Sequence, residues 1–252
     1  MAENNLPRRR KKKKSVLSVP LSFIAICAAL VFGLSVFFKV SVIEVEGNNL
    51  YTAQEVIDAS GIEEGDNLVF VNCIAADSRI YSKLSYIENV SVSRRLPNKI
   101  VISIVESRGE AVIAYGGDMW ILGTDCKLLQ KADASQTADM ITVTGITPTA
   151  PTLGEALVGD ASDAGKVAYL SDMLTAMAQF GMCKDITKID MSNVASPEFD
   201  YLDRFTVKMG SYENVEYKIE LLLSAVGMLE QGDTGTIDLS LSADNKAHFS
   251  PD

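Results

Sequence analysis

The chain has 252 residues, of which 47% are hydrophobic and 22% are charged, and its formal net charge is −10. This length accommodates about one or two folded domains, and the composition is close to that of ordinary globular proteins. Seven of the 23 basic residues form one run near the N-terminus, whereas 32 of the 33 acidic residues follow that run. The acidic remainder argues against nucleic-acid binding by the folded part, because phosphate binding requires a positive surface.

The basic run consists of Arg8, Arg9, Arg10, Lys11, Lys12, Lys13 and Lys14. Beside a membrane such a run contacts anionic lipid, at about 1 kcal/mol for each cation. DNA binding is the alternative, but the run has no interleaved aromatic residues. We therefore predict that residues 1–15 form a cytoplasmic tail at a membrane surface.

The segment that follows, Val16–Phe38, is 23 residues long and contains no charged residue. About 20 apolar residues cross the hydrocarbon core as a helix, so the segment predicts a transmembrane helix. The positive-inside bias then places the tail in the cytoplasm and everything after Lys39 outside the plasma membrane. A cleaved signal peptide is the alternative, but it has a shorter apolar region and a small-residue cleavage site, which is missing before Lys39.

Four cysteines are present, Cys27 in the predicted span and Cys73, Cys126 and Cys183 after it. Three exported cysteines cannot all pair with one another, and no CxxC motif exists, so neither a redox motif nor a zinc site is supported. Cys73 and Cys183 stand among apolar residues and are predicted to be buried thiols.

Residues 39–108 show the order strand, helix, helix, strand, strand. Thr52 and Glu55 have the spacing of a capping box, and Gly61 fits the end of that helix. A second helix is predicted from about Asn72 to about Leu84.

A hairpin completes this region. Val90 and Val92 alternate with serines, Leu96-Pro97-Asn98 makes the turn, and the return strand places three isoleucines on one face. Two helices on one face of a three-stranded sheet form an α+β layer arrangement.

The strand, the Gly47-Asn48-Asn49 turn and the stretch Ile87–Arg108 resemble a POTRA domain of the FtsQ/DivIB type. That stretch has the family's Val-rich strand, basic Pro turn and apolar strand ending in an acidic and a basic residue. The family usually has a proline shortly afterwards, where this chain has Gly109-Glu110.

Residues 109–252 are similar to the family's C-terminal β domain. Two short strands are predicted within 119–129, around a turn in which Cys126-Lys127 replaces the family's glycine. Helices are predicted over Asp163–Phe180 and Glu216–Glu230, and each is followed by an Ile-Asp strand, which suggests two related helix–strand units. Phe205–Gly210, with Lys218 eight residues later, also resembles the family pattern.

The predicted fold class is therefore α+β, with a single transmembrane helix, a β-α-α-β-β POTRA domain and a C-terminal mixed β-sheet domain with two helices. The predicted segments are the tail at 1–15, the transmembrane helix at 16–38, the POTRA domain at 39–108 and the β domain at 109–252.

The residues offer no recognisable catalytic site. His248 is the only histidine and lies four residues from the end, and no GxSxG, HExxH or phosphate-binding glycine loop exists. Asp190 and Asp238 could form a carboxylate pair, but polar residues that alternate outward from a strand explain them more simply. We predict a protein that is not an enzyme, with no cofactor, metal or small-molecule substrate.

The last residues predict a strand at a sheet edge, with backbone groups able to pair with another chain. An ordinary edge strand protected by Lys246 and Pro251 is the alternative, and the residues alone leave both open. In the FtsQ/DivIB family, this end of the β domain receives a strand from the coiled-coil partner FtsB/DivIC. The resemblance implies that 246–249 supply the pairing backbone, with Phe249 as the apolar anchor. The implied partner-binding residues are Leu241, Lys246, Ala247, His248 and Phe249.

The resemblance implies a non-enzymatic scaffold of the divisome at the division septum. It would bind the FtsL–FtsB/DivIC pair outside the membrane and help assemble or regulate septal peptidoglycan synthesis, which adds septal peptidoglycan synthases to the expected partners. A POTRA-type chaperone for other exported proteins and a membrane-tethered envelope enzyme are the alternatives. Histidine is the side-chain type that ordinarily changes charge near neutral pH, so His248 would tune the interface.

Overall fold

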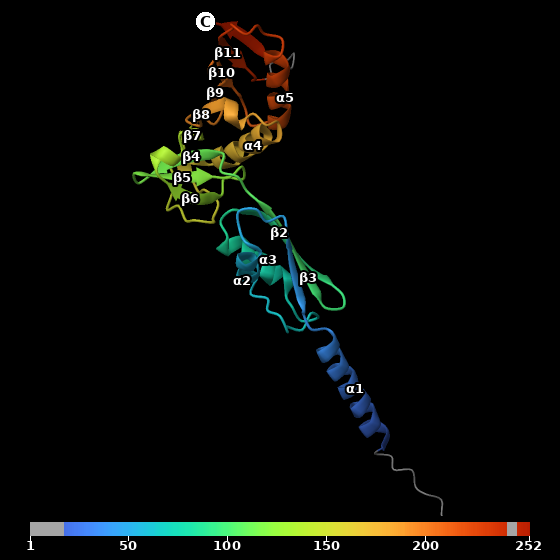
Figure 1. The fold of residues 1–252 in the computed structure, drawn as a ribbon. Coiled ribbons are helices and arrows are strands. Elements are labelled where there is room, and N and C mark those ends of the chain that lie inside the picture. Colours follow the sequence, from blue (N-terminus) through green and yellow to red (C-terminus); the bar gives the residue numbers. More distant parts are fainter. Residues whose placement is uncertain (1–17, 241–245) are drawn as a thin grey trace, which may run out of the picture.

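The computed structural model describes residues 18–240 and 246–252. An apolar helix, a small three-stranded domain and a nine-stranded sheet follow one another along an elongated molecule (Figure 1). The first two parts contain α1 Ser18–Phe37, β1 Val42–Glu46, α2 Ala53–Ser60, α3 Cys73–Lys83, β2 Ile87–Arg95 and β3 Lys99–Glu106. The third part contains β4 Ala111–Tyr115, β5 Asp118–Leu122, β6 Leu128–Ala132, β7 Ile141–Thr144, α4 Lys166–Gln179, β8 Ile186–Asp190, β9 Glu198–Tyr201, β10 Phe205–Lys208, α5 Val215–Val226, β11 Gly235–Asp238 and β12 His248–Pro251.

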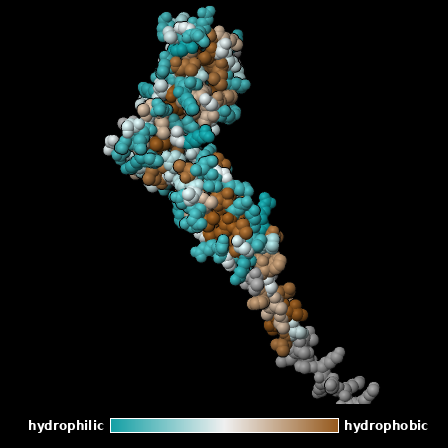
Figure 2. All heavy atoms as spheres, in the orientation of Figure 1, coloured by the Kyte–Doolittle hydropathy of each residue, from teal (hydrophilic) through white to brown (hydrophobic). Residues whose placement is uncertain are grey.

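Helix α1 carries exposed apolar side chains on all sides, and Figure 2 shows it in white to brown along its length. Within residues 18–240 and 246–252, no helix is long and apolar enough to cross a membrane. The predicted span Val16–Phe38 begins two residues before the described part, and the predicted tail at 1–15, with Arg8–Lys14, lies outside it. The transmembrane helix and its orientation stay predictions.

The three-stranded sheet has the order β1-β3-β2, with β1 parallel and β2 antiparallel to β3. Ile100, Ile102 and Ile104 are buried on the face that α2 and α3 cover, because alternate residues of a strand share one face. Both predicted helix starts are confirmed: Thr52 and Glu55 form a capping box, and Asn72 accepts a hydrogen bond from the Ala75 N–H.

The second sheet has the order β12-β11-β10-β9-β8-β7-β4-β5-β6 and mixes parallel with antiparallel pairs. Helices α4 and α5 contribute to its large hydrophobic core and contact each other. The α+β class, with a mixed sheet and two α-helices in the C-terminal region, is therefore confirmed. Of the two thiols predicted to be buried, Cys183 is buried, but Cys73 is only half-buried because it opens α3, near the domain surface.

Two β-α-β units repeat within this sheet. Helix α4 joins the parallel strands β7 and β8, and α5 joins the parallel strands β10 and β11. The backbone bonds after each second strand also match, since Met191 N–H donates to Thr144 C=O over 2.9 Å and Leu239 N–H donates to Lys208 C=O over 2.8 Å. The repeated Ile-Asp pattern in the sequence thus corresponds to a repeated fold unit.

The two sheet domains contact each other through a buried lysine. Lys127, in the turn before β6, is 1% exposed, and its Nζ donates to the carbonyl oxygens of Tyr81 over 3.2 Å and Ile87 over 2.8 Å. The same ammonium lies 3.6 Å from the centre of the Tyr81 ring. Nearby, the Tyr86 hydroxyl donates to Gln130 over 3.1 Å. These contacts join the C-terminal end of α3 and the start of β2 to the second sheet.

Candidate functional site

Strand β12 lies at one edge of the nine-stranded sheet, at the end of the molecule far from α1 (Figure 1). It pairs antiparallel with β11, with Ile237 opposite Phe249 and Asp238 opposite His248. The predicted edge strand therefore exists, but it covers 248–251 instead of the predicted 246–249. The shift arises because the strand is set by the register against β11, which the local pattern of residues does not encode.

The outer edge of β12 offers few backbone groups. Asp252 N–H donates to Thr234 C=O over 3.3 Å, so alternate residues from there, at 250 and 248, direct their backbone groups toward β11. The groups of Phe249 and Pro251 then face away from the sheet. Since proline has no N–H, Phe249 supplies the outward-facing donor of this strand.

The predicted partner-binding residues differ in their surroundings. Phe249 is half-buried and packs edge-on against Phe205 of its own chain, with ring centres 6.1 Å apart, so only part of the ring can meet another protein. Ala247 is also half-buried against the core, whereas Lys246 and His248 are exposed. Leu241 lies outside the described residues.

The turn that leaves β11 is held by Asp238. Its carboxylate accepts bonds from the Ser240 backbone N–H, over 2.8 Å, and from the Ser240 hydroxyl. Burial pushes the pKa of Asp238 upward, but the bonds from Ser240 and the charges of Lys208 and His248 outweigh it, so the pKa lies below its ordinary value. The group is therefore a fixed anion beside the base of β12.

A second buried lysine supports the loop beneath this turn. Lys218 is fully buried, and its Nζ donates to the carbonyl oxygens of Met209 over 2.7 Å and Ser211 over 2.6 Å. Between those residues, Gly210 touches Ser240 so closely that a Cβ on the glycine would lie 2.6 Å from the Ser240 Cα. The sequence singled out Lys218 by resemblance, and the structure assigns it to the support of the β11–β12 edge.

The two carboxylates that could have formed an acid–base pair lie far apart. Asp190 and Asp238 lie on β8 and β11, which β9 and β10 separate by about 14 Å at ordinary strand spacing. Burial raises the pKa of the Cys126 thiol, and raises that of Cys183 to about 12, so both stay protonated at neutral pH. Throughout 18–240 and 246–252, no three His, Cys, Asp or Glu side chains are grouped to hold a metal ion.

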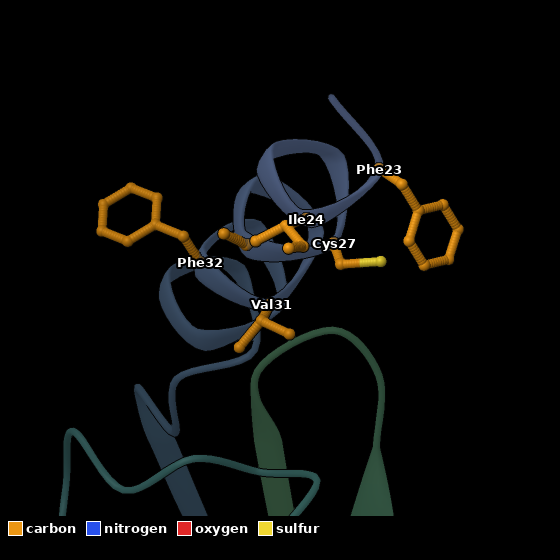
Figure 3. Close-up of a pocket in the computed structure, with 6 residues that line it drawn as sticks. Phe23, Ile24, Cys27, Val31 and Phe32 are labelled. Atoms are coloured by element: carbon orange, nitrogen blue, oxygen red, sulfur yellow. The ribbon is translucent and has the colours of Figure 1, made fainter. Parts of the chain in front are cut away.

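A concave surface lies on α1. Figure 3 shows Phe23, Ile24, Cys27, Val31 and Phe32 around it, and Ala28 completes the lining. Its lining side chains are apolar apart from one thiol, so this face is suited to an apolar environment and provides no charged or catalytic group.

The arrangement defines a class of protein: a β-α-α-β-β domain of the POTRA kind between an apolar helix and a mixed-sheet domain with an open terminal edge. A family profile described as "POTRA domain, FtsQ-type" matches residues 38–107. Cell division protein DivIB of Clostridium botulinum (strain Hall) is 24% identical over 237 residues, which cover 93% of this chain and 91% of the relative.

Shorter stretches match other relatives at higher identity. DivIB of Brevibacillus brevis is 37% identical over 103 residues, covering 40% of this chain and 38% of the relative. Cell division protein FtsQ of Corynebacterium glutamicum is 31% identical over 124 residues, covering 44% of this chain and 55% of the relative. The chain belongs to the FtsQ/DivIB family of cell-division proteins.

Proposed function

We propose that the chain is a non-enzymatic scaffold of the divisome that binds the FtsL–FtsB/DivIC pair and helps assemble or regulate septal peptidoglycan synthesis. The observation that carries this proposal is the terminal strand β12, which lies at an open edge and keeps one outward-facing N–H at Phe249. Edge strands with free backbone groups bind other chains by adding a strand.

The surroundings of β12 favour a pre-formed edge. Its base is held by Asp238 and by the loop that Lys218 anchors, so little ordering is needed when a partner strand is added. The exposed Lys246 and His248 stand beside the edge, and charges at the rim of an interface mainly affect its specificity and association rate.

The proposal includes membrane anchoring by Val16–Phe38, with the basic tail in the cytoplasm and both sheet domains outside, at the division septum. Its support is the uncharged 23-residue stretch and the exposed apolar side chains of α1. Septal peptidoglycan synthases would then be reached through the bound FtsL–FtsB/DivIC pair.

The test uses the full chain in lipid nanodiscs and compares Phe249→Ala with Phe249→Pro for binding of the purified FtsL–FtsB/DivIC pair. Both variants lose the ring, but only the proline also removes the outward N–H. Relative to Phe249→Ala, Phe249→Pro should weaken binding by about tenfold or more, which corresponds to about 1.4 kcal/mol. Thermal unfolding of both variants checks that the domain stays folded.

Lys246→Ala and Lys131→Ala provide a matched pair, because Lys246 lies two residues before β12 and Lys131 lies on β6, the strands at the two edges of one sheet. We expect Lys246→Ala to slow association and Lys131→Ala to leave it unchanged. If Phe249→Pro bound the partner pair as tightly as the unmodified chain, strand addition at β12 would be wrong.

A further inference from the structure

Four of the exposed large apolar side chains of the small domain lie in its loops and in the first turn of α3. Val69 is 51% exposed, Phe70 84%, Ile74 78% and Leu96 74%. They come from the connection between α2 and α3, from the first turn of α3, and from the β2–β3 turn. We call these four residues the proximal patch.

The proximal patch lies at the end of the domain from which α1 leaves. Leu68 N–H donates to Phe38 C=O over 2.7 Å, and Val40 N–H donates to Asp66 C=O over 2.8 Å. The β2–β3 turn meets the same stretch, because Ser41 N–H donates to Asn98 C=O over 2.9 Å. Figure 1 shows both loops beside the upper end of α1.

The loops that carry the patch are fixed in place. Asn67 accepts bonds from Val69 N–H, over 3.0 Å to its side chain, and from Phe70 N–H, over 2.9 Å to its carbonyl. The Arg94 guanidinium donates to the Val71 carbonyl and so ties the hairpin to this loop. The apolar side chains are therefore held outward by local structure, at the cost of exposing them to water.

The surroundings indicate what covers the patch. It lies beside the C-terminal end of α1, whose apolar side chains are exposed on all sides, so one apolar medium would serve both. Exposed basic residues at this end, Lys39, Arg94 and Arg95, are balanced by the exposed acidic residues Glu63, Glu64 and Asp66. Burial of apolar surface, and not attraction to anionic headgroups, therefore provides the driving force.

We propose that the proximal patch docks on the interface of the bilayer that α1 enters, with Phe70 and Leu96 inserted at the boundary between headgroups and acyl chains. The inference rests on the proposed membrane anchoring. Docking at two loops on either side of the α1 exit fixes the tilt of the small domain. Through the Lys127 contacts, it also fixes the direction in which β12 faces away from the membrane.

The test places a tryptophan in the patch of the full chain, by Phe70→Trp, and reconstitutes it in phosphatidylcholine vesicles whose acyl chains carry bromine. Met228→Trp is the matched control, since Met228 is also 84% exposed but follows α5 in the second sheet domain. The native Trp120 is buried in that domain and gives a constant background. We expect bromine to remove about half of the added emission of Phe70→Trp, because inserted rings lie about 5–10 Å deep. The added emission of Met228→Trp should be unaffected.

If bromine removed the same fraction of the added emission from both variants, while the chain floats with the vesicles, the docking surface would be overturned and the anchor would stay intact. A chain that does not float with vesicles would overturn the anchor and the docking together. Shielding of the introduced indole of Phe70→Trp that appears only when the partner pair is added would assign the patch to a protein, which also overturns the proposal.

A second variant keeps the test independent of the inserted label. Phe70→Ser with Leu96→Ser should broaden the distribution of distances between the bilayer and position 228, measured by energy transfer. Val105→Ser is the control, because Val105 is 54% exposed near the opposite end of β3. Equal distributions in the double variant and the control would contradict docking.

Discussion

At the scale of the residue, Asp163 is a buried carboxylate with two defined partners. It is 4% exposed, accepts a bond from Thr147 N–H over 2.6 Å, and pairs with Lys166 at 2.7 Å. The Lys166 side chain, followed by the Thr147 N–H, lowers the pKa of Asp163 below its ordinary value of 3.8. A carboxylate whose pKa is lowered in the folded state stabilises the fold at pH values above its ordinary pKa. This stabilisation is lost as the pH falls through the folded pKa.

Asp163→Asn should therefore reduce the free energy of unfolding by about 2 kcal/mol at pH 7, the range for a hydrogen bond to a charged group. The difference from the unmodified chain should shrink below the ordinary pKa of the carboxylate, and denaturant unfolding at several pH values measures it. Asp139→Asn, at an exposed position, controls for the loss of charge alone. If the difference in the free energy of unfolding between Asp163→Asn and the unmodified chain stayed constant down to acidic pH, the charge of Asp163 would not be the source of the stabilisation.

Residues whose role depends on near neighbours in sequence were predictable. Thr52 with Glu55, and Asn72, bond within one helical turn, so their spacing alone predicted both helix starts. Lys127 was not predictable in this way, because a lysine in a turn ordinarily points to water. Its partners, Tyr81 and Ile87, lie 46 and 40 residues earlier and belong to the other domain.

At the scale of the element, the repeated β-α-β units depend on a glycine after the first strand of each. Gly145 has φ +81°, and a Cβ there would lie 2.1 Å from the Ser192 backbone nitrogen. Gly116 also has positive φ, +64°, but a Cβ would meet nothing within 4 Å. Substitution of Gly116 therefore measures the cost of the backbone conformation alone, whereas substitution of Gly145 measures that cost together with the close contact.

Gly116→Ala should cost about 1–2 kcal/mol, the usual penalty of the left-handed conformation. Gly145→Ala should cost about 1–3 kcal/mol more, because the chain that leaves β8 must move away. Chemical denaturation of both variants measures the difference, and equal losses would show that the contact relaxes freely. Gly210→Ala, in the second unit, should resemble Gly145→Ala and also weaken partner binding, because Gly210 touches the turn before β12.

Helices were predicted best where the spacing of the apolar residues and the capping residues indicate the same ends. The helix predicted over Asp163–Phe180 is α4 Lys166–Gln179, with a short 3₁₀ turn before it, because Gly165 at φ +82° separates the two. The second predicted helix, Glu216–Glu230, ends earlier, at Val226. The order of the nine strands in the sheet could not be predicted from the sequence pattern, because parallel partners such as β7 and β8 are brought together by an intervening helix.

At the scale of the whole molecule, the two sheet domains are linked by one connection and by the contacts around Lys127. The Tyr81 carbonyl belongs to the last turn of α3, where unpaired C=O groups attract a cation. Burial lowers the pKa of the Lys127 ammonium, although the charge of Asp125 partly offsets this effect. The bonds to two carbonyls and the Tyr81 ring thus hold a cation that water no longer solvates. Removing this cation should therefore affect both domains, because its partners lie in one and its backbone in the other.

Lys127→Ala should reduce the free energy of unfolding by about 1–3 kcal/mol, because it leaves the buried Ile87 carbonyl oxygen and the partly buried Tyr81 carbonyl oxygen without their donor. It should also broaden the distance distribution between genetically encoded spin labels at Ser78 and Met228, which lie in different domains. Lys131→Ala is the control: this lysine lies nearby in β6, but its side chain is 53% exposed and pairs with Asp118. Broadening in Lys127→Ala alone would identify the buried ammonium as the group that sets the angle between the domains. An unchanged distribution would assign that angle to the packing around Tyr86 and Gln130.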